Sequence, residues 1–166
     1  MHIYKYGAVL GNGPSHVNYD GEADILIGCN VPPRQVDATI VTDIEVVRAL
    51  HEGRIELPYP LIVSSQAFEK MKELTLESRH GIISVFRTRD WYSSAHYAAQ
   101  HLIMIGCKKI SIWGCDSIFT DEVSSLTDRI VVPKPTPFVK QWRRCWTEME
   151  TNSTEVDFVF HKPSLQ

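Results

Sequence analysis

Short apolar runs recur along the chain, and most of them end at a glycine or a small polar residue. Runs of this length bounded by such residues are typical of buried β-strands rather than helices. We therefore predict strands near residues 8–10, 25–29, 38–42, 61–63, 82–86 and 110–113, with a closing strand in the segment VDFVF at 156–160.

Stretches with helical spacing of apolar residues separate these strands. Asp43 is a candidate N-cap for the first stretch, Ser65 can cap the second, and Gly106 is placed to end the third. The predicted helices lie near residues 44–53, 66–74, 95–105 and 138–150. In the last one, the apolar spacing of Trp142, Cys145 and Met149 favours a core-facing stripe over a basic, aromatic surface for single-stranded nucleic acid.

Alternating short strands and amphipathic helices predict parallel strand pairing with helices on both faces of the sheet. The expected fold is thus a three-layer, Rossmann-like, doubly wound α/β domain. A length of 166 residues fits one domain spanning 1–166, with a loop or small lid at about 117–137.

The composition argues against a protein that binds nucleic acid, spans a membrane or holds zinc. The formal net charge of -3 gives no electrostatic case for nucleic acid or an anionic membrane. No apolar stretch approaches the length of a membrane-spanning helix, and the N-terminal residues lack the apolar region of a signal peptide. The four cysteines form no CxxC pair, so we expect reduced thiols, a cytoplasmic location and no metal site of the zinc type.

Small polar residues follow several of the predicted strands. In parallel α/β sheets ligands bind beyond the carboxyl ends of the strands, so a ligand site is expected there. The segments concerned are Gly11-Asn12-Gly13, Cys29-Asn30, Thr42-Asp43, Ser64-Ser65 and Gly114-Cys115-Asp116. The first of them matches neither GxGxxG nor the P-loop pattern.

Three segments in order carry a resemblance to known families. They are VLGNGPS at 9–15, the strand that ends in Cys29-Asn30, and SSAHYAAQHLIMIGCKKISIWGCD at 93–116. Together they resemble the bacterial sialyltransferases with a GNGPS-type first loop, and the related MptE-like domains that include 6-hydroxymethylpterin pyrophosphokinases. The resemblance implies a Rossmann-type fold and a nucleotide or CMP-sugar-like nucleotide sugar as ligand.

The resemblance also implies roles for individual residues. Nucleotide-binding residues are expected at Gly11, Asn12, Gly13, Ser15, Asn30, Ser93 and Ser94. Glycine lets a backbone approach an anion closely, and a helix that begins at Ser93–Ser94 presents free N–H groups to a phosphate. The pyrophosphokinases need Mg²⁺, so Asp43 and Asp116 are the candidate catalytic carboxylates, with no tightly bound cofactor and Mg²⁺ arriving with the nucleotide.

Plainer structural roles stay open for the same residues. Asn12-Gly13 is a favoured turn pair, Asp43 suits a helix cap, and Asp116 can bond neighbouring loops. The sialyltransferases use a catalytic histidine after the Gly-x-Asp strand, whereas residues 117–160 contain none here. Two functions therefore remain: a small transferase that moves a glycosyl or pyrophosphoryl group, or a non-catalytic nucleotide-binding module.

Overall fold

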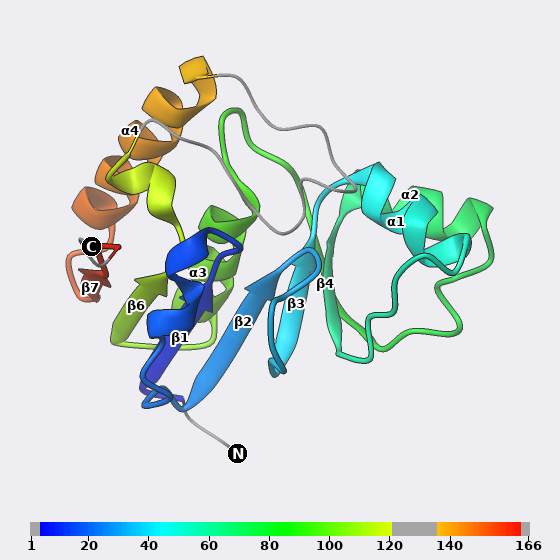
Figure 1. The fold of residues 1–166 in the computed structure, drawn as a ribbon, viewed down its shortest axis with the longest axis horizontal. Coiled ribbons are helices and arrows are strands. Elements are labelled where there is room, and N and C mark those ends of the chain that lie inside the picture. Colours follow the sequence, from blue (N-terminus) through cyan, green and yellow to red (C-terminus); the bar gives the residue numbers. More distant parts are fainter. Residues whose placement is uncertain (1–3, 121–135, 164–166) are drawn as a thin grey trace.

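A computed structural model of the chain describes residues 4–120 and 136–163, and these residues form one seven-stranded sheet in which every pairing is parallel (Figure 1). The strand order is β5-β4-β3-β2-β1-β6-β7. The strands are β1 (Tyr6–Leu10), β2 (Ile25–Cys29), β3 (Ala38–Val41), β4 (Leu61–Ser64), β5 (Ile82–Phe86), β6 (Lys109–Trp113) and β7 (Asp157–Phe160). The prediction of a Rossmann-like α/β sheet is confirmed, and each strand lies within a residue or two of its expected place.

Helices cover both faces of this sheet. Alternate residues of a strand point to opposite faces. Val9 and Ile40 pack toward α3 and α4, whereas Leu61 and Val63 pack toward α1 and α2. The helices are α1 (Ile44–His51), α2 (Ser65–Glu73), α3 (Ser94–Met104) and α4 (Thr136–Asn152), and two short 3-10 helices are η1 (Pro14–Asn18) and η2 (Asp116–Ile118).

The predicted end of α3 at Gly106 is confirmed, and the predicted cap of α2 lies one residue from the observed one. Gly106, which follows the C-cap residue Ile105 of α3, has a φ of +98°, and the N–H of Cys107 donates to the carbonyl of Leu102, which closes the helix. The cap of α2 is Ser64, whose hydroxyl accepts the N–H of Ala67 at 3.1 Å. The predicted cap at Ser65 is therefore wrong by one residue, because the strand runs straight into the helix.

Helix α4 turns its apolar side to the core, as its spacing predicts. Cys145, Trp146 and Met149 are buried, and Trp142 is half-buried. Most of the predicted loop at 117–137 lies outside the described residues; its first part forms η2.

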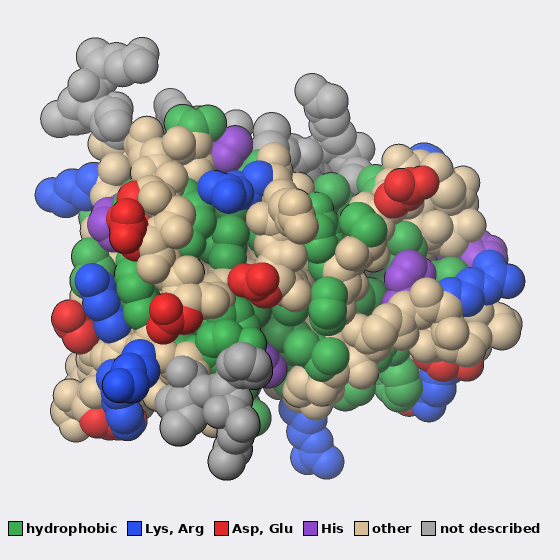
Figure 2. Space-filling model, turned by 90° about the horizontal axis from the view of Figure 1, so that it is seen from below, with side chains coloured by type: hydrophobic (Ala, Val, Ile, Leu, Met, Phe, Trp, Pro, Cys, Tyr) green, Lys and Arg blue, Asp and Glu red, His purple; other side chains and the backbone are tan. Residues whose placement is uncertain are grey.

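Charges of both signs are interspersed on the face where the strands begin, with hydrophobic side chains between them (Figure 2). All four cysteines are free, and three of them are buried. Within the described ranges, no helix combines the length and the apolar character that crossing a membrane requires.

Candidate active site

The strand order reverses between β1 and β6. From β1 the chain builds outward to β5, and it then returns to place β6 on the other side of β1. Such a switch point is where parallel α/β sheets bind ligands, at the carboxyl ends of the strands. In Figure 1 the segments that follow β1 and β6 lie above these ends.

The loops after β1 and β6 are hydrogen-bonded to each other. The N–H of Gly11 donates to the carbonyl of Trp113, and the N–H of Gly13 donates to that of Gly114, both at 2.7 Å. The amide of Ser15 donates to Asp116 Oδ2 at 3.0 Å, and the Ser15 hydroxyl donates to Asp116 Oδ1. We call residues 11–15 and 113–116 the clasp.

The glycines of the clasp are explained by this close approach of two backbones. A Cβ on Gly13 would lie 2.6 Å from the Gly114 carbonyl oxygen and 2.7 Å from Asp116 Oδ2. Gly114 itself has a φ of +69°, which side chains rarely tolerate. The amides of Gly11, Gly13 and Ser15 thus have protein acceptors, and the predicted contact of this loop with a ligand stays a prediction.

Asn12 connects the clasp to the next strand. Its side chain is 8% exposed, and its Nδ2 donates to the carbonyl of Cys29 at 2.8 Å. The first loop is therefore fixed on two sides, by β6 through its backbone and by the end of β2 through Asn12.

A second group of polar residues meets at the ends of β2 and β3. Asn30 Nδ2 lies 3.2 Å from both Asp43 Oδ2 and Ser94 Oγ. The hydroxyls of Thr42 and Ser94 are 2.8 Å apart. We call Asn30, Thr42, Asp43 and Ser94 the polar cluster; three of the four are predicted site residues. Thr42 is not among the individual residues predicted for the site, although it belongs to the segment Thr42-Asp43 predicted to follow a strand at this edge.

Asp43 occupies the N-cap position of α1, yet its side chain makes no capping hydrogen bond. Instead, its Oδ2 accepts from Asn30 Nδ2, with the Thr42 hydroxyl 3.5 Å away. No hydrogen bond reaches Asp43 Oδ1 from any described residue. The carboxylate therefore has one oxygen available to a ligand.

The N-terminus of α3 opens toward the polar cluster. Ser94 is its first residue, and neither the Ser94 amide nor the Ala95 amide has an acceptor within the described ranges. Free N–H groups at a helix N-terminus, together with the helix dipole, favour a phosphate. The amides of Ser94 and Ala95 are therefore the candidate donors to an anion beside the polar cluster.

Ser93 lies next to the cluster and bonds elsewhere. Its amide donates to His96 Nδ1 at 2.9 Å, and His96 Nε2 donates to the carbonyl of Trp142 at 3.0 Å. His96 is fully buried and stacks on Trp146 with ring centroids 4.1 Å apart. Burial lowers the pKa of His96 to about 3, so the ring is neutral and holds α3 against α4.

The two candidate catalytic carboxylates are not brought together. Asp43 follows β3 and Asp116 follows β6, and β2 and β1 lie between them, so about 14 Å separates the strand ends. The described residues contain no group of three or more acidic, histidine or cysteine side chains placed to hold a metal ion. Asp43 and Asp116 therefore do not share one ion.

Arg87 and Arg89, which follow β5, are both exposed. The Arg89 guanidinium lies over the ring of Tyr92, 4.9 Å from its centroid, and donates to the Tyr92 hydroxyl.

After β7, the ring of His161 stacks on the ring of Trp113, with 3.5 Å between the ring centroids. Burial lowers the pKa of His161.

No protein-family model matches the sequence, and no curated protein matches it. Solved structures do match in fold. The sialyltransferase CstII from Campylobacter jejuni, in complex with the substrate analogue CMP-3FNeuAc, superposes with a TM-score of 0.57 and 14% identity over 96% of this chain and 82% of that one. A Tyr-to-Phe variant of the sialyltransferase Cst-II in complex with CMP gives a TM-score of 0.51 and 12% identity, over 98% and 89% of the two chains. This confirms the sialyltransferase-like fold; the likeness to MptE-like domains stays a prediction.

Proposed function

We propose that the chain is a glycosyltransferase that binds a nucleotide sugar of the CMP-sugar type at the carboxyl edge of its sheet. The observation that carries the proposal is the polar cluster, in which Asn30 holds Asp43 and Ser94 together at the N-terminus of α3. The fold shared with sialyltransferases that were solved with CMP or a CMP-sugar analogue supports this choice of ligand.

The chain's own groups have distinct roles in this proposal. The amides of Ser94 and Ala95 hold the phosphate. Asn12 and Asn30, whose side-chain amides are bonded within the protein, keep the first loop and the polar cluster in place beside the nucleoside. Asp116 acts as a positioning residue, because both of its carboxylate oxygens accept from Ser15 and keep the first loop in place.

In the proposed glycosyl transfer, one bond forms at the anomeric carbon of the sugar and one bond breaks. The acceptor's hydroxyl oxygen attacks the anomeric carbon of the bound sugar. The bond from that carbon to the phosphate oxygen breaks, and CMP leaves with the electron pair. The acceptor's proton passes to Asp43 Oδ1, the open oxygen of the cluster.

In the alternative reaction, pyrophosphoryl transfer, the Asp43 carboxylate would serve as a metal ligand instead of a proton acceptor. In that alternative, the Asp43 carboxylate would hold Mg²⁺, which prefers oxygen ligands and often binds through one or two carboxylates, and the ion would neutralise charge on the nucleotide's phosphates. A requirement for Mg²⁺ in turnover therefore distinguishes pyrophosphoryl transfer from glycosyl transfer.

A thermal-shift screen with CMP, CMP-sugars, other nucleotide sugars and nucleoside triphosphates, each with and without Mg²⁺, tests the proposal. A ligand at 100 times its dissociation constant adds about 2.7 kcal/mol to the free energy of unfolding. We expect CMP and CMP-sugars to raise the melting temperature without Mg²⁺. If no nucleotide raises it, the proposal fails.

The second candidate, a non-catalytic nucleotide-binding module, is favoured by one observation, the absence of histidine from residues 117–160. Incubation with a bound CMP-sugar and a panel of sugar acceptors separates the two. Release of CMP together with a glycosylated product supports the transferase. Binding without either product supports the module.

A further inference from the structure

Strand β5 ends the sheet and exposes apolar side chains. Among the described residues it pairs with β4 alone, so its outer edge offers backbone N–H and C=O groups to solvent. Ile83 is 56% exposed and Val85 is 45% exposed. Proteins usually protect such an edge with Lys, Pro or a covering element, and the sequence IISVF contains neither residue.

The pairing of β5 is regular over most of its length. A register shift lies near Ile62, and from Ser84 to Phe86 each residue has its partner in β4. A bulge that disturbs only the start of the strand leaves the remaining edge straight enough to accept another strand.

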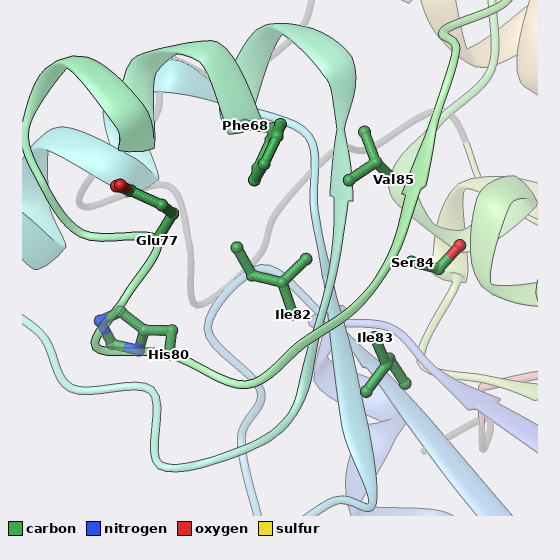
Figure 3. A pocket seen from close by; sticks show the side chains of 7 residues that line it. All are labelled: Phe68, Glu77, His80, Ile82, Ile83, Ser84 and Val85. Atoms are coloured by element: carbon green, nitrogen blue, oxygen red, sulfur yellow. The ribbon is translucent and has the colours of Figure 1, made fainter.

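An open hollow adjoins this edge (Figure 3). Phe68 of α2 and Ile82 and Val85 of β5 point toward one another within it, and Glu77 and His80 lie at the end where β5 begins. Glu77 Oε2 is buried and has no hydrogen-bond partner within the described ranges. A buried carboxylate oxygen without a partner is unfavourable, and a cation from outside would satisfy it.

We propose that β5 is a self-association edge, on which a second copy of this chain pairs its own β5 in antiparallel fashion about a two-fold axis. A two-fold contact uses the same surface on both copies, and it places identical edge strands antiparallel. The unpaired backbone groups of the two strands then bond to each other, and Ile83 and Val85 leave water.

The charges beside β5 favour a second copy as the occupant. Glu77 precedes the strand, whereas Arg87 follows it, is exposed and makes no ion pair with any described residue. Antiparallel pairing sets the end of one β5 beside the beginning of the other. Arg87 directly follows Phe86, the last residue of β5, so in this pairing it lies beside the beginning of the second copy's β5, the end near Glu77. Arg79 in the same turn is exposed, and its charge stays in water.

Sedimentation velocity of the full chain at rising protein concentration tests this inference. We expect a concentration-dependent dimer, and Val85→Lys should raise its dissociation constant at least tenfold by placing a cation on the edge. Met104→Lys is the matched control, because Met104 is 73% exposed at the C-terminal end of α3, a helix that packs on β1, β2 and β3. Circular dichroism and melting temperature show whether each variant is folded.

Charge reversal gives an independent second test. Glu77→Arg should weaken the dimer about tenfold, and Glu77→Arg combined with Arg87→Glu should restore most of the loss. A wild-type chain that stays monomeric at every concentration overturns the proposal, as does a dimer that neither Val85→Lys nor Glu77→Arg weakens. None of these positions lies in the polar cluster, so the test does not depend on the proposed function.

Discussion

Ser15 and Asp116, which are 101 residues apart in the sequence, are joined by two hydrogen bonds from the amide and the hydroxyl of Ser15 to one carboxylate. This pair closes the clasp and joins the loop after β1 to the segment that follows β6, on the other side of the switch point. The first loop is thus held in place by the protein itself.

Asp116→Asn tests how much this pair contributes. The substitution removes the charge that strengthens both bonds, so we expect the free energy of unfolding to fall by about 1–3 kcal/mol in chemical denaturation. Ser15→Ala removes the hydroxyl alone and should cost about 1 kcal/mol. A double variant that loses the full sum of the two effects would show that the residues act independently, against the structure.

Gly13→Ala tests the close approach within the clasp. A Cβ at this position would contact the Gly114 carbonyl, so the loops must separate, and we expect a loss of about 1–3 kcal/mol. Gly81→Ala is the matched control, because a Cβ there meets nothing within 4 Å. It should change stability by less than about 1 kcal/mol. Equal effects of the two substitutions would contradict this account of the glycine.

Ser94→Ala and Ser93→Ala make the same chemical change at adjacent positions with different expected results. Ser94 belongs to the polar cluster, so its loss should weaken CMP binding about tenfold in titration calorimetry. Ser93 is the N-cap of α3, so its loss should lower stability by about 1 kcal/mol and leave the affinity unchanged. If Ser93→Ala weakened CMP binding and Ser94→Ala did not, the ligand would not bind at the polar cluster.

His96 predicts a pH dependence of stability. Its folded pKa is about 3, below the ordinary 6.5, so the unfolded chain binds a proton first as the pH falls. The contribution of His96 to the free energy of unfolding is therefore fully present above pH 6.5 and declines as the pH falls below that value. Between pH 6.5 and pH 5 the loss is about 1.5 kcal/mol.

The matched experiment compares the wild type with His96→Gln at several pH values. The pKa values of three other histidines are also lowered, and these histidines reduce stability at low pH in both proteins. They are His80, His101 and His161. The variant should be less stable at pH 8 and should show a shallower decline toward pH 5. Parallel pH profiles would mean that His96 is not buried in its neutral form.

The sequence predicted the strands well because buried parallel strands are short apolar runs, and β1 and β6 stand out as such. It also predicted that Asn30, Asp43 and Ser94 lie at one edge, since each follows a strand or begins a helix there. It could not predict which groups bond to each other. Asn12 illustrates the limit: its bond to the Cys29 carbonyl is buried, so Asn12→Ala would lower stability as well as any affinity for a nucleotide.

Asn30 adopts a φ of +51°, a left-handed conformation that few residues other than glycine accept readily. Glycine would relieve the backbone but lose the bonds to Asp43 and Ser94. Aspartate would tolerate the conformation but set a second carboxylate against Asp43. Position 30 is thus constrained by its backbone and by its neighbours at once. In a saturation library selected for folded protein, it should accept fewer amino acids than any exposed position of the same sheet edge.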